Sequence, residues 1–199
     1  MSNIIRAYFN QKAAIWDETV AEKDPVKLRR MAGRLNIKPG SRVLDIGTGT
    51  GVFLPFVLNE IGQDGHITAL DIAEEMLMRA RAKGFYGDID YLQANVSNIP
   101  LHDGLFDIVV CYSSFPHFQD KPRALAEINR VIKSGGKLAI CHTSSRATIN
   151  GIHRSIAAVA NDTIPDSSQM RDMLLKAGFT EVKIADLPTS YLTSARKGS

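Results

Sequence analysis

The chain has 199 residues, of which 44% are hydrophobic and 23% are charged, and these proportions exclude an intrinsically disordered chain. The net charge of +3 is too small and too evenly spread to predict nucleic-acid binding, and two cysteines are too few for a disulfide scaffold or an all-cysteine zinc site. No apolar run reaches the roughly 18 residues of a membrane span, and the N-terminus lacks a signal-peptide core. We therefore expect residues 1–199 to form one cytoplasmic domain, a monomer or a homodimer, without a membrane or nucleic-acid partner.

Short β-rich runs alternate with helical periods along the chain. This alternation predicts an α/β fold with a parallel sheet and helices on both faces. Gly178 stands where a helix C-cap glycine belongs. In chain order we expect helix 4–20, strand 42–46, helix 50–60, strand 66–70, helix 73–82, strand 89–93, strand 106–111, helix 121–132, strand 137–141, helix 149–160, helix 168–177, strand 179–185 and strand 191–195.

The sharpest feature is the sequence VLDIGTGTG at residues 43–51, in which a strand runs directly into a glycine-rich turn and then a helix. Glycines let the backbone approach a ligand closely, and the following helix N-terminus adds unpaired N–H groups. Taken alone, the pattern is also that of an ordinary tight turn between a strand and a helix. A phosphate-binding P-loop is excluded, because no Gly-Lys-Ser/Thr sequence follows any of these glycines.

Asp71 ends the second expected strand. A carboxylate at this place accepts hydrogen bonds from the two hydroxyls of a ribose. The alternative interpretation is that Asp71 caps the helix that starts at residue 73. Together, the acid and the glycine-rich turn predict a ligand that contains a nucleoside.

Several segments resemble the class I S-adenosylmethionine (SAM)-dependent methyltransferases, in particular their ubiquinone/menaquinone-biosynthesis-like branch. The resemblance runs from residue 8 to residue 140 and rests on YFNQKAAIWDE, VLDIGTGTG, ALDIAEEML, NIPLHDGLFDIVVC and FPHFQDKPRALAEINRVIKSGGKLAI. It implies a Rossmann-like, doubly wound, seven-stranded, mostly parallel sheet with an antiparallel last strand. It also implies that residues 1–20 form a lid helix over SAM, and that the enzyme transfers the methyl group of SAM to a small-molecule acceptor by in-line displacement.

The resemblance assigns a cofactor role to individual residues. Those expected around the methionine part of SAM are Asp45, Gly47, Gly49 and Gly51, with Asp71 on the ribose, Ile72 on the adenine, and Asn95 and Val96 near the adenine amine. Thr48, Met76, Cys111 and Tyr8 complete the expected cofactor-binding set. Asn95 departs from the family, which usually has aspartate there, but an amide oxygen still accepts a hydrogen bond.

Acceptor residues should lie on strand ends and the loops that follow them. Residues 142–167 form the longest stretch without a family motif, and we expect this segment to cap the acceptor site. Its His142 and His153, together with His117, are the candidate catalytic bases. The competing interpretations are that His117 only shapes its loop and that His153 is a surface or capping histidine.

Three alternatives stay open at this point. The chain could bind SAM without catalysis, or it could be a nicotinamide oxidoreductase, although Val52 stands where such an enzyme needs glycine. The third is a methyltransferase for a metal-bearing acceptor held by His117, His142 and His153, because imidazole suits several transition metals. No spacing enforces that third alternative, and the expected site contains no metal ligand.

Overall fold

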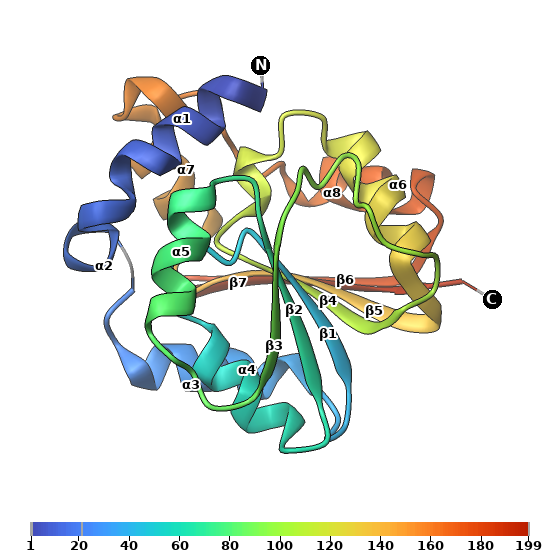
Figure 1. Ribbon diagram of the computed structural model, residues 1–199. Coiled ribbons are helices and arrows are strands. Elements are labelled where there is room, and N and C mark those ends of the chain that lie inside the picture. The colour runs from blue at the N-terminus through green and yellow to red at the C-terminus, as the bar shows by residue number, and fades with distance from the viewer. Residues whose placement is uncertain (1, 21, 199) are drawn as a thin grey trace.

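A seven-stranded sheet forms the centre of the computed structural model, which describes residues 2–20 and 22–198 (Figure 1). Its strands lie in the order β3-β2-β1-β4-β5-β7-β6. They are β1 (Arg42–Ile46), β2 (His66–Asp71), β3 (Asp88–Gln93), β4 (Phe106–Tyr112), β5 (Ile132–His142), β6 (Phe179–Leu187) and β7 (Ser190–Lys197). All seven expected strands are present.

Strands β1 to β5 pair in parallel, whereas β7 pairs antiparallel with both β5 and β6. The predicted antiparallel last strand is therefore confirmed. The chain leaves β1 toward β2 on one side and reaches β4 on the other, so the strand order reverses between β1 and β4. In such sheets, ligands bind at the carboxyl ends of the strands beside this reversal.

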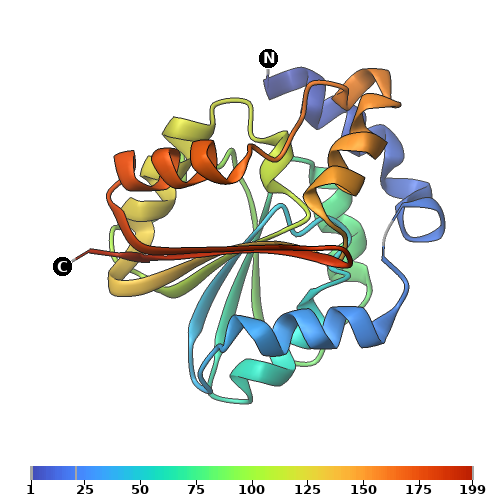
Figure 2. The same ribbon diagram turned by 180° about the vertical axis from the view of Figure 1, so that it is seen from behind.

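Helices cover both faces of the sheet, with α6 and α8 on one face and α3 and α4 on the other (Figures 1 and 2). The helical segments are α1 (Ser2–Lys12), η1 (Ala13–Ile15), α2 (Trp16–Thr19), α3 (Pro25–Leu35), α4 (Leu54–Ile61), α5 (Glu74–Ala82), η2 (Phe115–His117), α6 (Lys121–Val131), α7 (Arg146–Arg154), η3 (Ala157–Val159) and α8 (Ser167–Lys176).

The alternation of side chains along each strand divides the core into two layers. In β1, Leu44 and Ile46 pack on the side of α6 and α8, and Val43, which precedes Leu44, packs on the side of α3 and α4. Because both faces are covered, the central strands are mostly apolar rather than alternating. This rigid double layer fixes the positions of the strand ends where the pocket lies.

The helix α3 was missing from the expected elements. Its start carries clear signals, since the Asp24 side chain accepts from the backbone N–H groups of Val26 and Lys27, and Pro25 occupies the first helical turn. Its apolar face carries Leu28, Met31, Ala32 and Leu35, all buried.

Three expected helices have different bounds. Helix α4 begins at Leu54 rather than at residue 50, because the glycine-rich turn extends further and Pro55 fits only a first turn. The N-terminal helix is divided into α1, η1 and α2, and the helix expected at 149–160 is divided into α7 and η3. Gly178 follows α8 with a φ of +86°, as expected of a residue after a C-cap.

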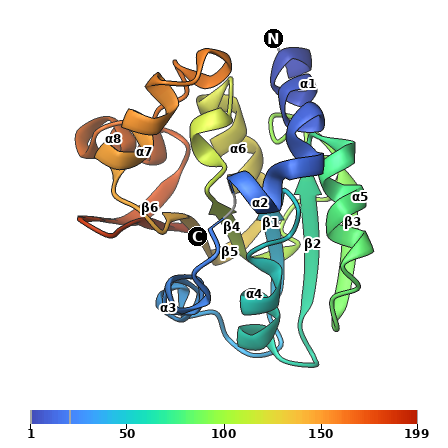
Figure 3. The same ribbon diagram turned by 90° about the vertical axis from the view of Figure 1, so that its left-hand side faces the viewer.

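The N-terminal helices lie against α5 (Figure 3). Arg6 donates to both carboxylate oxygens of Glu74, at 2.8 and 2.6 Å, and Ala13 packs on Ala73 and Met76. Among the residues with described structure, every helix is too short to cross a membrane. The cytoplasmic location stays a prediction.

Candidate functional site

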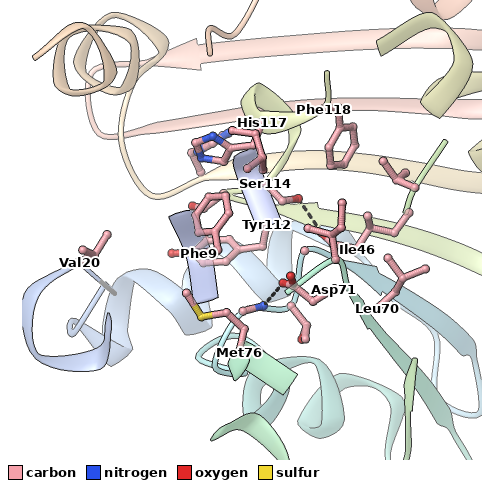
Figure 4. A pocket seen from close by; sticks show the side chains of 18 of the residues that line it. Phe9, Val20, Ile46, Leu70, Asp71, Met76, Tyr112, Ser114, His117 and Phe118 are labelled. Atoms are coloured by element: carbon pink, nitrogen blue, oxygen red, sulfur yellow. Dashed lines mark hydrogen bonds between the residues drawn. The ribbon is translucent and has the colours of Figure 1, made fainter. Parts of the chain in front are cut away.

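A pocket of about 580 Å³ opens at the carboxyl ends of β1, β2, β4 and β5. This volume suits a small molecule of cofactor size. In Figure 4, Asp71 and Met76 lie at one end of the pocket, and Phe9 and His117 lie toward the other. The two ends differ in chemistry and are described in turn.

The glycine-rich turn after β1 forms the floor of the first end. Gly47 has a φ of +71°, and a Cβ there would lie 2.3 Å from the Cβ of Ser114. Ser114 is fixed in that place because its Oγ donates to the carbonyl of Ile46 at 2.6 Å. Only glycine fits at residue 47, so the turn can lie directly against the loop that follows β4.

Asp71 connects this turn to the end of β2. Its Oδ2 accepts from the N–H of Gly49 at 2.8 Å, and its Oδ1 accepts from the N–H of Ala73 at 2.8 Å. Burial raises the pKa of Asp71 to about 6. The side chain does not cap α5, because that helix begins at Glu74 and its N-cap is Ala73.

The structure brings most of the expected cofactor residues into one wall. Gly47, Thr48, Gly49, Asp71, Ile72, Met76, Asn95 and Val96 all line the pocket. Asp45, Gly51, Cys111 and Tyr8 lie outside that wall, and their contact with a cofactor stays a prediction.

Asp45 lies behind the wall, where it is 2% exposed. Its Oδ2 accepts from the hydroxyl of Thr48 at 2.6 Å. Burial raises the pKa of Asp45 to about 7, and the nearby carboxylate of Asp71 adds to the shift. Asp45 therefore supports the turn through Thr48.

Asn95 uses its side-chain oxygen locally, because Oδ1 accepts from the N–H of Ser97 at 2.9 Å. One lone pair of that oxygen is therefore occupied. The predicted hydrogen bond to an adenine amine would have to use the other lone pair.

The first end fits the nucleoside part of SAM. Each carboxylate oxygen of Asp71 accepts one backbone N–H and keeps further lone pairs for ribose hydroxyls. A Cβ at Gly49 would meet nothing within 4 Å, so a ligand can approach the backbone there. Ile72 and Met76 supply apolar surface for a flat ring.

Three histidines from three elements line the second end. They are His117 in η2, His142 at the end of β5 and His153 in α7. The rings of His117 and His153 have centroids 4.8 Å apart, and Phe9 of α1 contacts His117 edge-on at 5.0 Å. The structure therefore brings together all three histidines that the sequence singled out.

The hydrogen bonds of the three rings differ. His117 Nδ1 lies 2.8 Å from Asp162 Oδ2, and His153 Nδ1 lies 2.5 Å from the backbone oxygen of Asp162. His142 is 1% exposed, and neither of its ring nitrogens has a hydrogen-bond partner among residues 2–20 and 22–198.

His117 and His142 lie in surroundings that favour neutral imidazole. Burial lowers the pKa of His142 to about 3, and the neighbouring histidines lower it further. Burial also lowers the pKa of His117, although the carboxylate of Asp162 opposes the shift. A neutral imidazole can accept a proton, which is what a general base must do.

Neither cysteine contributes to this end of the pocket. Cys111 packs in the core beneath α6 and α8, whereas Cys141 packs in the core on the side of α3 and α4, so the two thiols lie on opposite faces. Burial raises the pKa of both thiols. Within the part of the chain that the structure describes, no three side chains of His, Cys, Asp or Glu are placed to hold a metal ion.

Some pocket residues were not in the expected site. Glu22, Tyr112 and Thr143 line the wall, and the Tyr112 hydroxyl lies 3.2 Å from the hydroxyl of Thr143. Tyr112 is the last residue of β4 and Thr143 directly follows β5, so both lie at the strand ends where acceptor residues were expected, although neither was named as a site residue. Glu22 lies between α2 and α3, away from the strand ends, and no sequence pattern indicates that it belongs to the site.

Comparison with known protein families gives a match over residues 44–140 to the family described as "Methyltransferase domain". These residues include most of β1, all of β2, β3 and β4, and most of β5, so the matched region contains the glycine-rich turn and Asp71.

Two relatives and one solved structure illustrate the similarity. The ubiquinone/menaquinone biosynthesis C-methyltransferase UbiE of Vibrio campbellii is 30% identical over 81% of this chain and 72% of its own length. The enzyme of the same name from Shewanella piezotolerans is 27% identical over 99% of this chain and 90% of its own length. The crystal structure of a SAM-dependent methyltransferase from Aquifex aeolicus superposes with a TM-score of 0.74 at 24% identity, covering 94% of this chain and 97% of that one.

Proposed function

Since this chain belongs to the class I SAM-dependent methyltransferases, in the branch that includes the UbiE enzymes, we propose that its histidine-lined pocket end receives a small methyl acceptor. When bound, SAM supplies an electrophilic methyl group on a positively charged sulfur. The chain's own residues then have two tasks, which are to hold the cofactor at the first end and to orient the acceptor at the second.

The cofactor end is proposed to hold SAM through the backbone of Gly47 to Gly49 and through Asp71. The observation that carries the proposal is that Asp71 lines the pocket while it binds the N–H of Gly49. Ile72 and Met76 are proposed to pack on the adenine. Asp45 and Gly51 are proposed to act by supporting the turn.

Two segments are proposed to enclose the acceptor. Residues 1–20 contribute Ile5, Phe9 and Trp16 to the pocket, and residues 142–167 contribute Ile149 and Ile152. Apolar walls of this kind exclude water, and a water-poor site favours loss of the positive charge on sulfur during methyl transfer. We propose that residues 1–20 act as a lid and 142–167 as a cap.

The acceptor is proposed to be a small molecule, because the pocket volume is that of small-molecule sites. The UbiE relatives are named as C-methyltransferases of ubiquinone and menaquinone biosynthesis. The candidate acceptor atoms are carbon, oxygen, nitrogen and sulfur. A monomer or homodimer, without nucleic-acid or membrane partners, stays a prediction.

Isothermal calorimetry of the purified protein with SAM, with S-adenosylhomocysteine (SAH) and with NAD⁺ tests the cofactor assignment. We expect saturable heat with SAM and SAH and none with NAD⁺. Binding of NAD⁺ alone would overturn the proposal. A positive result would then be followed by measuring SAH production from SAM across a panel of small acceptors, because turnover distinguishes an enzyme from a protein that only binds SAM.

A further inference from the structure

Asp162 is the common partner of two of the three pocket histidines. Its carboxylate is hydrogen-bonded to Nδ1 of His117, and its backbone oxygen is hydrogen-bonded to Nδ1 of His153. Its other carboxylate oxygen lies 3.5 Å from the amide of Gln119. Asp162 is 8% exposed, so its side chain is largely removed from water.

A second pair of hydrogen bonds fixes Ile164, two residues after Asp162. The side chain of Asn150 donates to the backbone oxygen of Ile164 at 2.9 Å and accepts from the N–H of Ile164 at 2.8 Å. Asn150 and His153 are three residues apart on the same face of α7. One face of α7 therefore fixes the segment around Asp162 at two points, Asp162 itself and Ile164.

This arrangement determines which ring nitrogens carry protons. A carboxylate and a carbonyl oxygen can only accept, so Nδ1 of His117 and Nδ1 of His153 must both donate. In the neutral rings, the lone pair then lies on Nε2 of each. His142 adds a third imidazole, and neither of its ring nitrogens has a partner among the described residues. A buried polar group without a partner is costly, and a bound ligand would satisfy it.

We propose that Asp162 is a positioning residue that holds His117 as the general base, and that the methyl acceptor carries an O–H or N–H group directed at His117 Nε2. The inference rests on the proposed function, because it assigns a substrate class and a proton acceptor to the same pocket. His153 and His142 line the same end of the pocket and are proposed to accept further hydrogen bonds from the acceptor.

The proton and electron balance of the step is complete without another reactant. The acceptor atom forms a bond to the methyl carbon, and the electron pair of the carbon–sulfur bond stays on sulfur, which becomes the thioether of SAH. When the acceptor is methylated on its O or N, the proton of the O–H or N–H group moves to Nε2 of His117. The resulting imidazolium is stabilised by the carboxylate of Asp162, as in other carboxylate–imidazole pairs.

Charged and titratable groups surround His117 on several elements. Asp162 raises its pKa, whereas His153 of α7 and Lys121 of α6 lower it together with burial. His142 of β5 lines the same pocket. Removing the negative charge of Asp162 should therefore lower the basicity of His117.

The test uses ¹⁵N NMR of the histidine side chains in the full-length protein saturated with SAH. We expect His117 and His153 both to carry the proton on Nδ1. In Asp162→Asn the pKa of His117 should fall by about one unit or more, because an opposite charge within 4–6 Å is lost. His153 is the internal control, because its partner is the backbone oxygen, which the substitution keeps. A His117 proton on Nε2, or an unchanged pKa, would overturn the proposal.

Phenol and its O-methyl ether, anisole, test the acceptor class without knowledge of the natural acceptor. Phenol should shift the ¹⁵N signal of His117 Nε2 and anisole should not, since only phenol can donate a hydrogen bond. Equal shifts, or none with phenol, would count against an O–H or N–H acceptor. Saturable binding of Zn²⁺ that perturbs all three histidines at one equivalent would replace the base assignment with a metal site.

The failure of this inference can be separated from failure of the proposed function. If SAH does not bind by calorimetry, the proposed function is wrong. If SAH binds and the histidine tautomers or pKa values disagree, only the role of Asp162 and His117 is wrong. Once an acceptor is known, Asp162→Asn should lower kcat by about 100-fold, the lower range for general-base catalysis, with little change in KM for SAM.

Discussion

Asp71 holds the glycine-rich turn and faces the cofactor end of the pocket at the same time. Its oxygens accept from Gly49 and Ala73, so the carboxylate is oriented before any ligand arrives. A preoriented acceptor loses less freedom on binding. This double role makes Asp71 the residue on which the cofactor assignment depends most.

Replacing Asp71 with alanine should weaken SAH binding by about 1–3 kcal/mol, because hydrogen bonds to a charged acceptor are lost. Calorimetry would measure the change in Kd, and a thermal melt would check that the variant is folded. Asp88→Asn is the matched control, since Asp88 is an exposed carboxylate on the neighbouring strand β3 that bonds to His66. An unchanged Kd in Asp71→Ala would contradict the ribose assignment.

Asp45 should give the unfolding free energy a measurable pH dependence. Burial raises its pKa from the ordinary value of 3.8 to about 7 in the folded protein. Folding therefore takes up a proton at pH values between these two. Its contribution to stability is therefore fully present below about pH 4 and is lost as the pH rises through about 7. Asp45→Asn removes this dependence.

Urea unfolding of both proteins at pH 5 and at pH 8 measures the effect. The free energy of unfolding of Asp45→Asn minus that of the native sequence should be lower at pH 5 than at pH 8. This difference should change by up to about 1.4 kcal/mol per pH unit. The opposite contribution of His142, whose pKa is lowered, is present in both proteins and cancels in the difference. A difference that stays constant with pH would show that Asp45 is already charged in the folded state.

The sequence predicted the residues of the cofactor end better than the role of Asp162. The glycine-rich turn and Asp71 follow two strand ends within a short stretch, so topology alone brings them together. Asp162 is 45 positions from His117 and lies in a segment without a motif. Its role depends on the packing of α7, which no local pattern encodes.

The N-terminal helices are held to the rest of the molecule at several points beside the pocket. Arg6 pairs with Glu74, and Asp17 forms an ion pair with Lys83 at 2.7 Å and accepts from the hydroxyl of Thr50. Since Thr50 belongs to the glycine-rich turn, α2 contacts the proposed cofactor site directly.

Trp16 should report on this contact. It is the only tryptophan of the chain, it lines the pocket, and it packs edge-on against Phe9 with ring centroids 5.5 Å apart. Addition of SAH should change its fluorescence emission with a midpoint that agrees with calorimetry. Asp71→Ala should need more SAH for the same change. If saturating SAH leaves the emission of Trp16 unchanged, residues 1–20 do not close over the cofactor.

The expected elements were accurate where strands are short, apolar and bounded by glycine. Helices were less accurate, because their ends depend on tertiary contacts. Helix α3 could have been found, since Asp24 and Pro25 precede an apolar face with helical spacing. The division of α1, η1 and α2 follows from packing against α5 and could not be read from periodicity.

At the scale of the whole molecule, cofactor binding and stability are coupled. A ligand that binds only the folded state at 100 times its Kd stabilises that state by about 2.7 kcal/mol. For a chain of this length, that corresponds to a rise in Tm of roughly 5–10 °C. Thermal melts with SAH should show this rise and melts with NAD⁺ should not. A rise of equal size with both would point to non-specific binding.

Strand β7 is the last strand in the chain, yet it lies between β5 and β6. In a nascent chain leaving the ribosome, β5 is therefore an unpaired edge strand until residues 190–197 emerge. This takes several seconds at ordinary rates of synthesis. An unpaired edge strand readily pairs with other polypeptides. Chaperones that hold the growing chain over this interval should raise the yield of native enzyme, and premature termination before residue 190 should produce aggregates.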